Sequence, residues 1–346
     1  MRFKKNINRR AIVFVTKILV VFGTACMGLS SPGEEALLQK ARNKFGPIPS
    51  QPPLLKDNPL TDAKVALGKV LYFDPRLSAD GSVSCNSCHD LNKGGIDGLP
   101  TSPGVKGQLG KRNSPTVFNA ILNSTQFWDG RAPDLIEQAK GPIQASVEMA
   151  NTPAKVVETL RGITAYVEHF RNAFPNETEP LTFTNVARAI AAFEATLLTP
   201  GSRFDQYLSG NDGILSEQEK RGLSLFLAKD CASCHKGANF GGLSFHRFGV
   251  AKKPSDEIRP LQDKGRQDVT HQASDEFVFR APSLRNVELT APYFHSGKAA
   301  DLREAITIMT LTQLGAKLKD QDIEDLAAFL KTLTGIPPKI ELPVLP

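Results

Sequence analysis

Cysteine is scarce in this chain, with five residues among 346. Four of the five form two Cys-x-x-Cys pairs, Cys85 with Cys88 and Cys231 with Cys234, and the fifth is Cys26 near the N-terminus. This distribution excludes the disulfide framework that stabilises many small secreted domains. Cysteine chemistry is therefore expected at the two pairs.

Acidic residues are absent from residues 1–26, which contain six Lys or Arg and an interrupted apolar run from Ala11 to Ala25. The run is too short for a membrane span, and the layout predicts a signal peptide over residues 1–26. The whole chain has 42 Lys and Arg against 36 Asp and Glu, so the remainder carries 36 of each and is formally neutral. Neither nucleic acid nor an anionic surface is therefore expected as a partner.

Cys26 follows three small residues, Gly23, Thr24 and Ala25, at the end of the leader. It could carry a lipid anchor or leave with the leader, and removal is favoured because cleavage near small residues is the commoner event. We expect an exported, periplasmic protein, with a lipid anchor at Cys26 as the alternative.

Strand-like alternation is also scarce, and apolar residues recur at helical spacing instead, so the predicted fold class is mainly α. Residues 239–282 are rich in Gly and Pro and show no clear period, which predicts a loop. Ser216 and Glu219 form a capping box at the start of one helix. Helices are expected over residues 33–45, 62–73, 184–198, 216–229, 301–314 and 320–333.

Each cysteine pair is followed directly by a histidine, His89 in the first pentad and His235 in the second. This is the pattern for covalent attachment of a c-type haem, in which the thiols bind the haem vinyl groups and the imidazole ligates the iron. A four-cysteine zinc site is the alternative. Haem is favoured because the pairs lie far apart in the sequence and the chain has an export signal.

The surroundings of the pentads are repeated along the chain. Residues 114–120 parallel residues 281–287, and Phe127-Trp128 parallels Tyr293-Phe294 before a Gly and an Asp-Leu helix start. We predict two cytochrome c-like haem domains related by internal duplication. The predicted segments are a signal peptide over 1–26, a helix and linker over 27–60, a first haem domain over 61–199 and a second haem domain over 200–346.

The ligand opposite each proximal histidine decides between a catalyst and an electron carrier. Met309 lies on a predicted helix face with Leu302, Ala305 and Ile306, where it could ligate iron or simply fill the core. Glu148 could be a solvated surface acid or a proton shuttle over an open haem. Trp128, the single tryptophan, could pack in the core or relay electrons.

These residues resemble the bacterial di-haem cytochrome c peroxidase family over nearly the whole chain, from about residue 54 to residue 346. Together with the pentads, six strings carry the resemblance: Leu71–Ser78, Arg112–Val117, Phe127–Arg131, Gly141–Ile143, Val147–Met149 and Pro292–Gly297.

The resemblance implies a low-potential peroxidatic haem with His89 proximal and with Glu148 and Gln138 in its distal pocket. It implies a high-potential haem, ligated by His235 and Met309, where electrons enter. Trp128 matches the tryptophan between the haems. It further implies an interdomain calcium bound by oxygen atoms only, the side chain of Asn113 and the carbonyls of Thr290 and Pro292.

One position departs from the family pattern. Where family members carry a second axial histidine for the peroxidatic iron, this chain has Val105, which cannot ligate. We therefore predict an iron that is five-coordinate or water-bound in the oxidised protein. Lys106 is a rival ligand, although its ammonium would have to lose a proton to bind.

The sequence thus predicts a periplasmic enzyme that reduces hydrogen peroxide to water with electrons from a c-type cytochrome or a cupredoxin. A homodimer is expected, as is common in the family. Two alternatives remain: a substrate oxidase similar to the di-haem enzyme that matures a tryptophan-derived quinone, and a non-catalytic electron carrier. Met309 argues against the oxidase, which lacks an axial methionine at its second haem.

Overall fold

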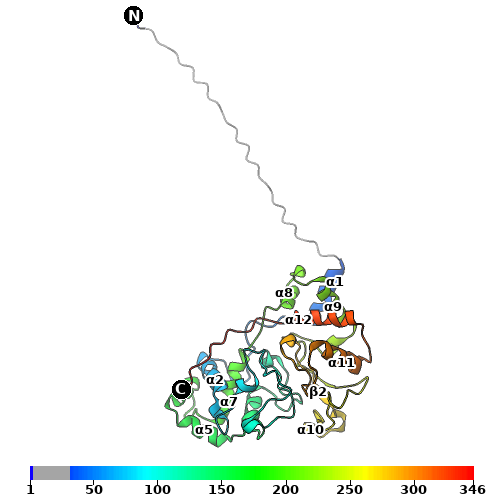
Figure 1. Cartoon of the computed structure of the whole chain (residues 1–346). Coiled ribbons are helices and arrows are strands. Elements are labelled where there is room, and N and C mark those ends of the chain that lie inside the picture. The colour runs from blue at the N-terminus through cyan, green and yellow to red at the C-terminus, as the bar shows by residue number, and fades with distance from the viewer. Residues whose placement is uncertain (3–31) are drawn as a thin grey trace.

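The computed structural model of the chain describes residues 1–2 and 32–346 (Figure 1). Apart from its first two residues, the predicted signal peptide lies outside the described part, and so does Cys26. Within the described residues, no helix combines the length and apolar character needed to cross a membrane.

The described chain is mainly helical, as predicted. An N-terminal helix, α1 (Pro32–Arg42), comes first. The rest of the first half contains α2 (Asp62–Phe73), α3 (Cys85–Cys88), α4 (Leu135–Gln144), α5 (Pro153–Arg161), α6 (Thr164–Ala173) and α7 (Phe183–Ala195). The second half contains α8 (Arg203–Leu208), α9 (Glu217–Ala228), α10 (Gln267–Thr270), α11 (Leu302–Leu314) and α12 (Asp320–Lys331).

The segment predicted as a loop over residues 239–282 is not entirely irregular. It contains α10 and two short antiparallel strands, β1 (Phe245–Arg247) and β2 (Val278–Arg280), with Phe245 opposite Arg280. Three-residue strands are too short to show the alternation by which a strand is recognised in sequence. The loop prediction was wrong for these elements.

Polar residues fix where most of the long helices begin. The side chains of Thr61, Thr182, Ser216 and Asp301 each accept a hydrogen bond from the backbone N–H three residues later, which satisfies an amide that the helix leaves free. At Ser216 the bond is reciprocated by Glu219, so the predicted capping box is confirmed.

The two halves are built on the same helix crossing. In the first half α2 packs on α7, and a Cβ atom at Gly68 would lie 1.8 Å from the carbonyl oxygen of Ala189. In the second half α9 packs on α12, and a Cβ atom at Gly222 would lie 1.9 Å from the carbonyl oxygen of Asp325. The backbones therefore touch at a glycine in both halves, which supports the predicted duplication.

The loops that follow the pentads repeat as well, and they correct one predicted alignment. Phe127 and Phe294 share a left-handed backbone, with φ of 66° and 67°, and the bridge of Gln126 with Ala132 recurs between Tyr293 and Ala299. The counterpart of Phe127 is therefore Phe294, not Tyr293. Trp128 corresponds in this register to His295.

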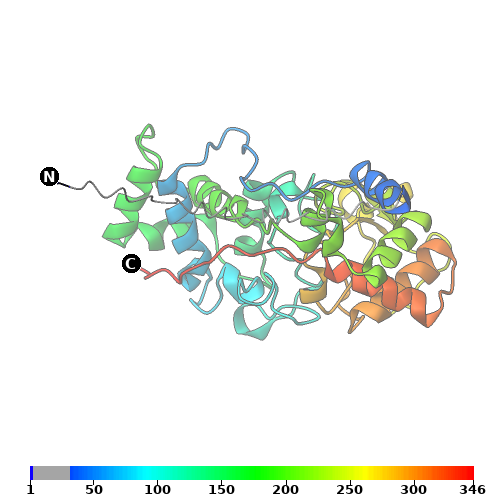
Figure 2. The ribbon, with the colours of Figure 1, turned by 90° about the horizontal axis from the view of Figure 1, so that it is seen from above.

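The ends of the described chain cross between the halves. α1 and the residues after it lie on the second half, where Phe45 stacks on Phe240 with ring centroids 4.0 Å apart. Beyond α12 the chain returns along the first half (Figure 2), where Arg76 Nη1 donates a hydrogen bond to the carbonyl oxygen of Pro346 at 2.8 Å. These crossings tie the two halves together.

We expect Gly68→Ala to destabilise the protein by about 3 kcal/mol or more, because its methyl group would overlap backbone that cannot move without separating α2 from α7. Chemical denaturation followed by circular dichroism measures this loss. Gly213→Ala is the matched control, since nothing lies within 4 Å of a Cβ atom there. Equal stability of the two variants would contradict the tight crossing.

Candidate haem and peroxide site

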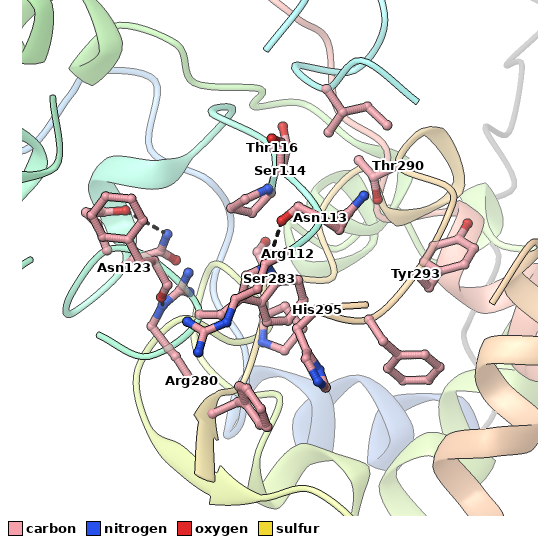
Figure 3. Close-up of a pocket in the computed structure, with 18 of the residues that line it drawn as sticks. Arg112, Asn113, Ser114, Thr116, Asn123, Arg280, Ser283, Thr290, Tyr293 and His295 are labelled. Atoms are coloured by element: carbon pink, nitrogen blue, oxygen red, sulfur yellow. Dashed lines mark hydrogen bonds between the residues drawn. The ribbon is translucent and has the colours of Figure 1, made fainter. Parts of the chain in front are cut away.

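One cavity of about 1000 Å³ is lined by residues of both pentads. Figure 3 shows part of its wall, to which both halves of the chain contribute. The predicted site residues that line it are Cys85, Cys88, His89, Asn113, Trp128, Gln138, Glu148, Cys231, Cys234, His235, Thr290, Pro292 and Met309. The fold therefore brings the whole predicted set together.

Both pentads adopt the same turn. The backbone N–H of His89 donates to the carbonyl oxygen of Cys85 at 3.0 Å, and that of His235 donates to Cys231 at 3.0 Å. The four cysteines of the pentads are free thiols, and burial raises the pKa of Cys88 and of Cys231 to about 11. Thiols that form no disulfide and lie beside a large apolar-lined cavity fit thioether attachment of a haem.

The two imidazoles are suited to bind iron. Burial lowers the pKa of His89, and it lowers the pKa of His235 to about 4, so both rings are neutral at physiological pH. Nδ1 of His235 lies 3.2 Å from the carbonyl oxygen of Phe240, which orients the ring. A neutral imidazole oriented through one nitrogen presents the other to a metal.

The zinc alternative does not fit this arrangement. Among the described residues, no three His, Cys, Asp or Glu side chains gather closely enough to hold a metal ion. The two Cys pairs therefore do not converge into a four-sulfur shell, and each serves its own end of the cavity.

The cavity differs between its two ends in the residue that could face the iron. α4 and α11 both begin after an aspartate cap, Asp134 or Asp301. Counted from these caps, Met309 of α11 has Pro142 as its counterpart on α4, and both line the cavity. The second end therefore has a thioether where the first has a proline without a ligand atom.

Glu148 and Gln138 lie at the first end of the cavity. Burial raises the pKa of Glu148, and the nearby positive charge of Arg131 offsets only part of this rise. Arg131 itself stacks on the ring of Phe127, with 3.4 Å from its guanidinium carbon to the centroid. A half-buried carboxyl with a raised pKa is suited to proton transfer. The proton-shuttle interpretation of Glu148 therefore fits its position better than that of a solvated surface acid.

Val105 and Lys106 do not line the cavity. Val105 is buried in the core of the first half, and its N–H donates to the carbonyl oxygen of Glu148 at 2.7 Å. Lys106 is exposed to solvent. The structure thus gives no support to Lys106 as an iron ligand.

Trp128 is fixed at the junction of the two halves. Its indole N–H donates to the carbonyl oxygen of Asn113 at 2.9 Å, and its ring packs against the apolar cluster of the second half that contains Phe279. Because it lines the shared cavity, the relay interpretation is compatible with its position.

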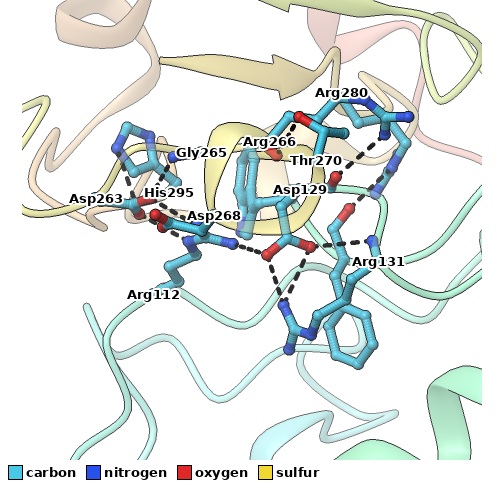
Figure 4. Close-up of polar contacts among 12 residues, drawn as sticks. Arg112, Asp129, Arg131, Asp263, Gly265, Arg266, Asp268, Thr270, Arg280 and His295 are labelled. Carbon is cyan, nitrogen blue, oxygen red and sulfur yellow. Dashed lines mark hydrogen bonds and ion pairs between the residues drawn. The ribbon is translucent and has the colours of Figure 1, made fainter. Parts of the chain in front are cut away.

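An ion-pair network beside Trp128 joins the halves (Figure 4). Arg112 donates to Asp129 at 2.5 Å and to Asp263 at 2.6 Å, and Arg131 binds Asp129 from the other side at 3.0 Å. Charge-assisted contacts of this kind set the orientation of the two domains more than they add stability.

Comparisons with known proteins agree with this geometry. Residues 62–213 match the family described as di-haem cytochrome c peroxidase, and residues 219–334 match cytochrome c. The chain is 50% identical to cytochrome c551 peroxidase of Pseudomonas aeruginosa over 95% of each chain. It is 46% identical to cytochrome c551 peroxidase of Nitrosomonas europaea over 81% of this chain and 82% of the relative.

The chain belongs to the di-haem cytochrome c peroxidase family. The predicted enzyme class and the two c-type haem domains are thereby confirmed. Among solved structures, a MauG-like protein associated with microbial copper homeostasis superposes with a TM-score of 0.74 at 32% identity, over 83% of this chain and 93% of that one.

Sequence reasoning missed one buried acid of this di-haem cytochrome c peroxidase. Glu194 on α7 is 5% exposed and lines the cavity near Cys85, and burial raises its pKa to about 8. Glu194 directly follows Phe193, which packs against Gly68. At the equivalent crossing in the second half, Leu330 directly follows Phe329, which packs against Gly222. The contrast between Glu194 and Leu330 was present in the sequence, but it could be recognised only once the two helix crossings were aligned.

We expect the stability of the haem-loaded protein to fall as the pH rises from 4.5, the ordinary pKa of a glutamate, to about 8, because folded Glu194 keeps a proton that the unfolded chain releases. Glu194→Gln should remove up to roughly 5 kcal/mol of this decline. Denaturant unfolding at several pH values measures it. Exposed Glu158→Gln is the control, and an unchanged pH profile in Glu194→Gln would refute the assignment.

Proposed function

We propose that this chain reduces hydrogen peroxide to water at the N-terminal haem, with electrons that enter at the C-terminal haem from a small redox protein. The difference between Met309 and Pro142 carries the proposal, since at equivalent helix positions the second end of the cavity offers a thioether and the first end a proline. The first end is thus suited to bind peroxide, and the second to transfer electrons. The closely related cytochrome c551 peroxidases support this assignment.

Two haems bound through the pentads would supply the redox chemistry, which delivers two electrons to each peroxide. The protein supplies the remaining parts of the reaction. Glu148 moves a proton between the two peroxide oxygens, so that the departing oxygen leaves as water. Gln138 donates a hydrogen bond in the same pocket, and Arg131 keeps a positive charge beside Glu148.

The electron path runs through the junction of the two halves. His235 and Met309 would hold the second iron, and a thioether ligand raises the reduction potential of that site. Trp128 lies between the two ends of the cavity, with its indole N–H anchored to Asn113. Its fixed orientation suits an electron relay.

We propose a calcium ion at the junction, bound by Asn113, Thr290 and Pro292. All three line the cavity, and Asn113 and Thr290 appear in its wall in Figure 3. Asn113 is 7% exposed, and its Nδ2 donates to the carbonyl oxygen of Leu99 at 2.9 Å. Its amide oxygen thereby remains for a hard cation such as calcium, together with backbone carbonyls.

The proposed location is the periplasm. The basic, apolar leader supports export, and covalent haem attachment suits a protein matured outside the cytoplasm. The donor would be a c-type cytochrome or a cupredoxin, and the proposed assembly is a homodimer. A lipid anchor at Cys26 is the alternative to release of the mature protein.

We expect Glu148→Gln to lower the rate of peroxide cleavage by about 10²–10⁴-fold, since the amide cannot shuttle the proton. The rate of peroxide entry should change little. Stopped-flow mixing of the loaded protein with peroxide separates the two steps. Glu137→Gln, at an exposed position on α4, is the control, and unchanged cleavage in Glu148→Gln would exclude the proton-shuttle role.

We expect the peroxidatic iron to be high-spin in the fully oxidised protein, because neither Val105 nor Lys106 lines the cavity. Electron paramagnetic resonance of the oxidised protein tests this. Lys106→Ala should leave the spectrum unchanged. A second low-spin signal, in addition to that of the haem held by His235 and Met309, that persists in Lys106→Ala would show that another side chain closes the site.

Two alternatives can be separated by turnover. A substrate oxidase, like the di-haem enzyme that matures a tryptophan-derived quinone, would require an organic substrate for activity. A non-catalytic carrier would show no peroxide turnover with a reduced donor cytochrome. Peroxide consumption that depends on the donor would support the peroxidase over both.

A further inference from the structure

Arg280 is a buried cation that the proposed reaction does not use. It ends β2, is 4% exposed and lines the cavity. Its Nε donates to the carbonyl oxygen of Phe127 at 3.2 Å, while Nη1 is buried and has no hydrogen-bond partner. An unpaired guanidinium nitrogen in such a place indicates a ligand that is absent from the protein chain itself.

Among the residues that the structure describes, no acid forms an ion pair or hydrogen bond with Arg280. Asp129 is the acid whose charge acts on Arg280, but its carboxylate is bound by Arg112 and Arg131 (Figure 4). Burial lowers the pKa of Arg280 to about 10, so the guanidinium remains protonated at physiological pH. Burial of an unpaired cation is costly, and an anion in the cavity would offset that cost.

The duplication identifies which end of the cavity this cation serves. Arg280 lies two residues before Pro282, and Asn113 lies two residues before Pro115 in the repeated loop. The carbonyl of Pro282 is close enough to His235 to act on its pKa, and that of Pro115 acts likewise on His89. Arg280 therefore occupies the same position relative to the second pentad as Asn113 occupies relative to the first.

The same register extends to the other proposed calcium ligands. Thr290 and Pro292 correspond to Asn123 and Thr125, counted from the left-handed residues Asn286 and Asn119. The counterpart of the calcium ligand set is thus Arg280 with Asn123 and Thr125, so one site would hold a bound cation and the other contains the fixed cation of Arg280.

We propose that Arg280 binds a carboxylate side chain of the second haem and acts there as a permanent counterpart of the proposed calcium ion. The inference rests on haem attachment at the second pentad and not on the peroxidase reaction. A guanidinium binds a carboxylate through two N–H groups, and a buried positive charge favours the reduced form of a nearby iron. Arg280 is therefore a positioning residue that holds the second haem and raises its reduction potential.

The test is a spectroelectrochemical titration of both haems in Arg280→Gln, Arg280→Lys and Arg247→Gln. Arg247 is the matched control, because it lies on the neighbouring strand β1 and does not line the cavity. We expect a downward shift in the midpoint potential of the second haem in Arg280→Gln, partial recovery in Arg280→Lys and no shift in Arg247→Gln. The potential in Arg280→Gln should also depend on pH, because a carboxylate that has lost its partner titrates closer to neutrality.

Three results would overturn the proposal. The first is that the second haem keeps its midpoint potential and pH dependence in Arg280→Gln, and the second is that only the midpoint potential of the first haem shifts. A wild-type potential that changes with added phosphate at constant ionic strength would assign Arg280 to a free anion. Haem content per chain is measured for each variant. If Arg280→Gln fails to retain haem, the midpoint potential of the second haem in Arg280→Lys tests the proposal instead. Failure of peroxide turnover alone would contradict the proposed function and leave this inference intact.

Discussion

The close crossing of two helices at a glycine is the constraint on which the rest of the structure depends. Gly68 brings α2 against the backbone of α7, and Gly222 brings α9 against α12. With no side chain between the backbones, the C-terminal turns of α7 and α12 reach the cavity, where Glu194 and Leu330 form part of its wall. Two copies of one crossing therefore form the two ends of one cavity.

The function proposed for the protein arises from the differences between the two copies. When the two halves are aligned, Met309 corresponds to Pro142, Leu330 to Glu194 and Arg280 to Asn113. The two residues of each pair differ in charge, in acidity or in the ligand atoms that they offer to the cavity. Duplication provides the two sites, and a few buried substitutions assign them different tasks.

The junction between the halves combines apolar, ionic and backbone contacts. Trp128 packs on the second half while Arg112 links Asp129 to Asp263, and the chain ends cross in both directions (Figure 2). Buried ion pairs contribute little net stability but tolerate few alternative orientations. Such a junction suits an enzyme in which electrons must cross between two fixed centres.

The sequence alone determined the haem attachment, the mainly helical class, the duplication and most helix starts, because each depends on residues close together in the chain. The pentads and the Ser216 cap are of this kind. It did not predict α5, α6 or α8, which are short and gain their stability from tertiary packing. Only the tertiary structure placed Lys106 outside the cavity, buried Glu194 and Arg280 within it, and set α1 on the second half. These depend on burial and on contacts between residues distant in sequence, which local patterns do not encode.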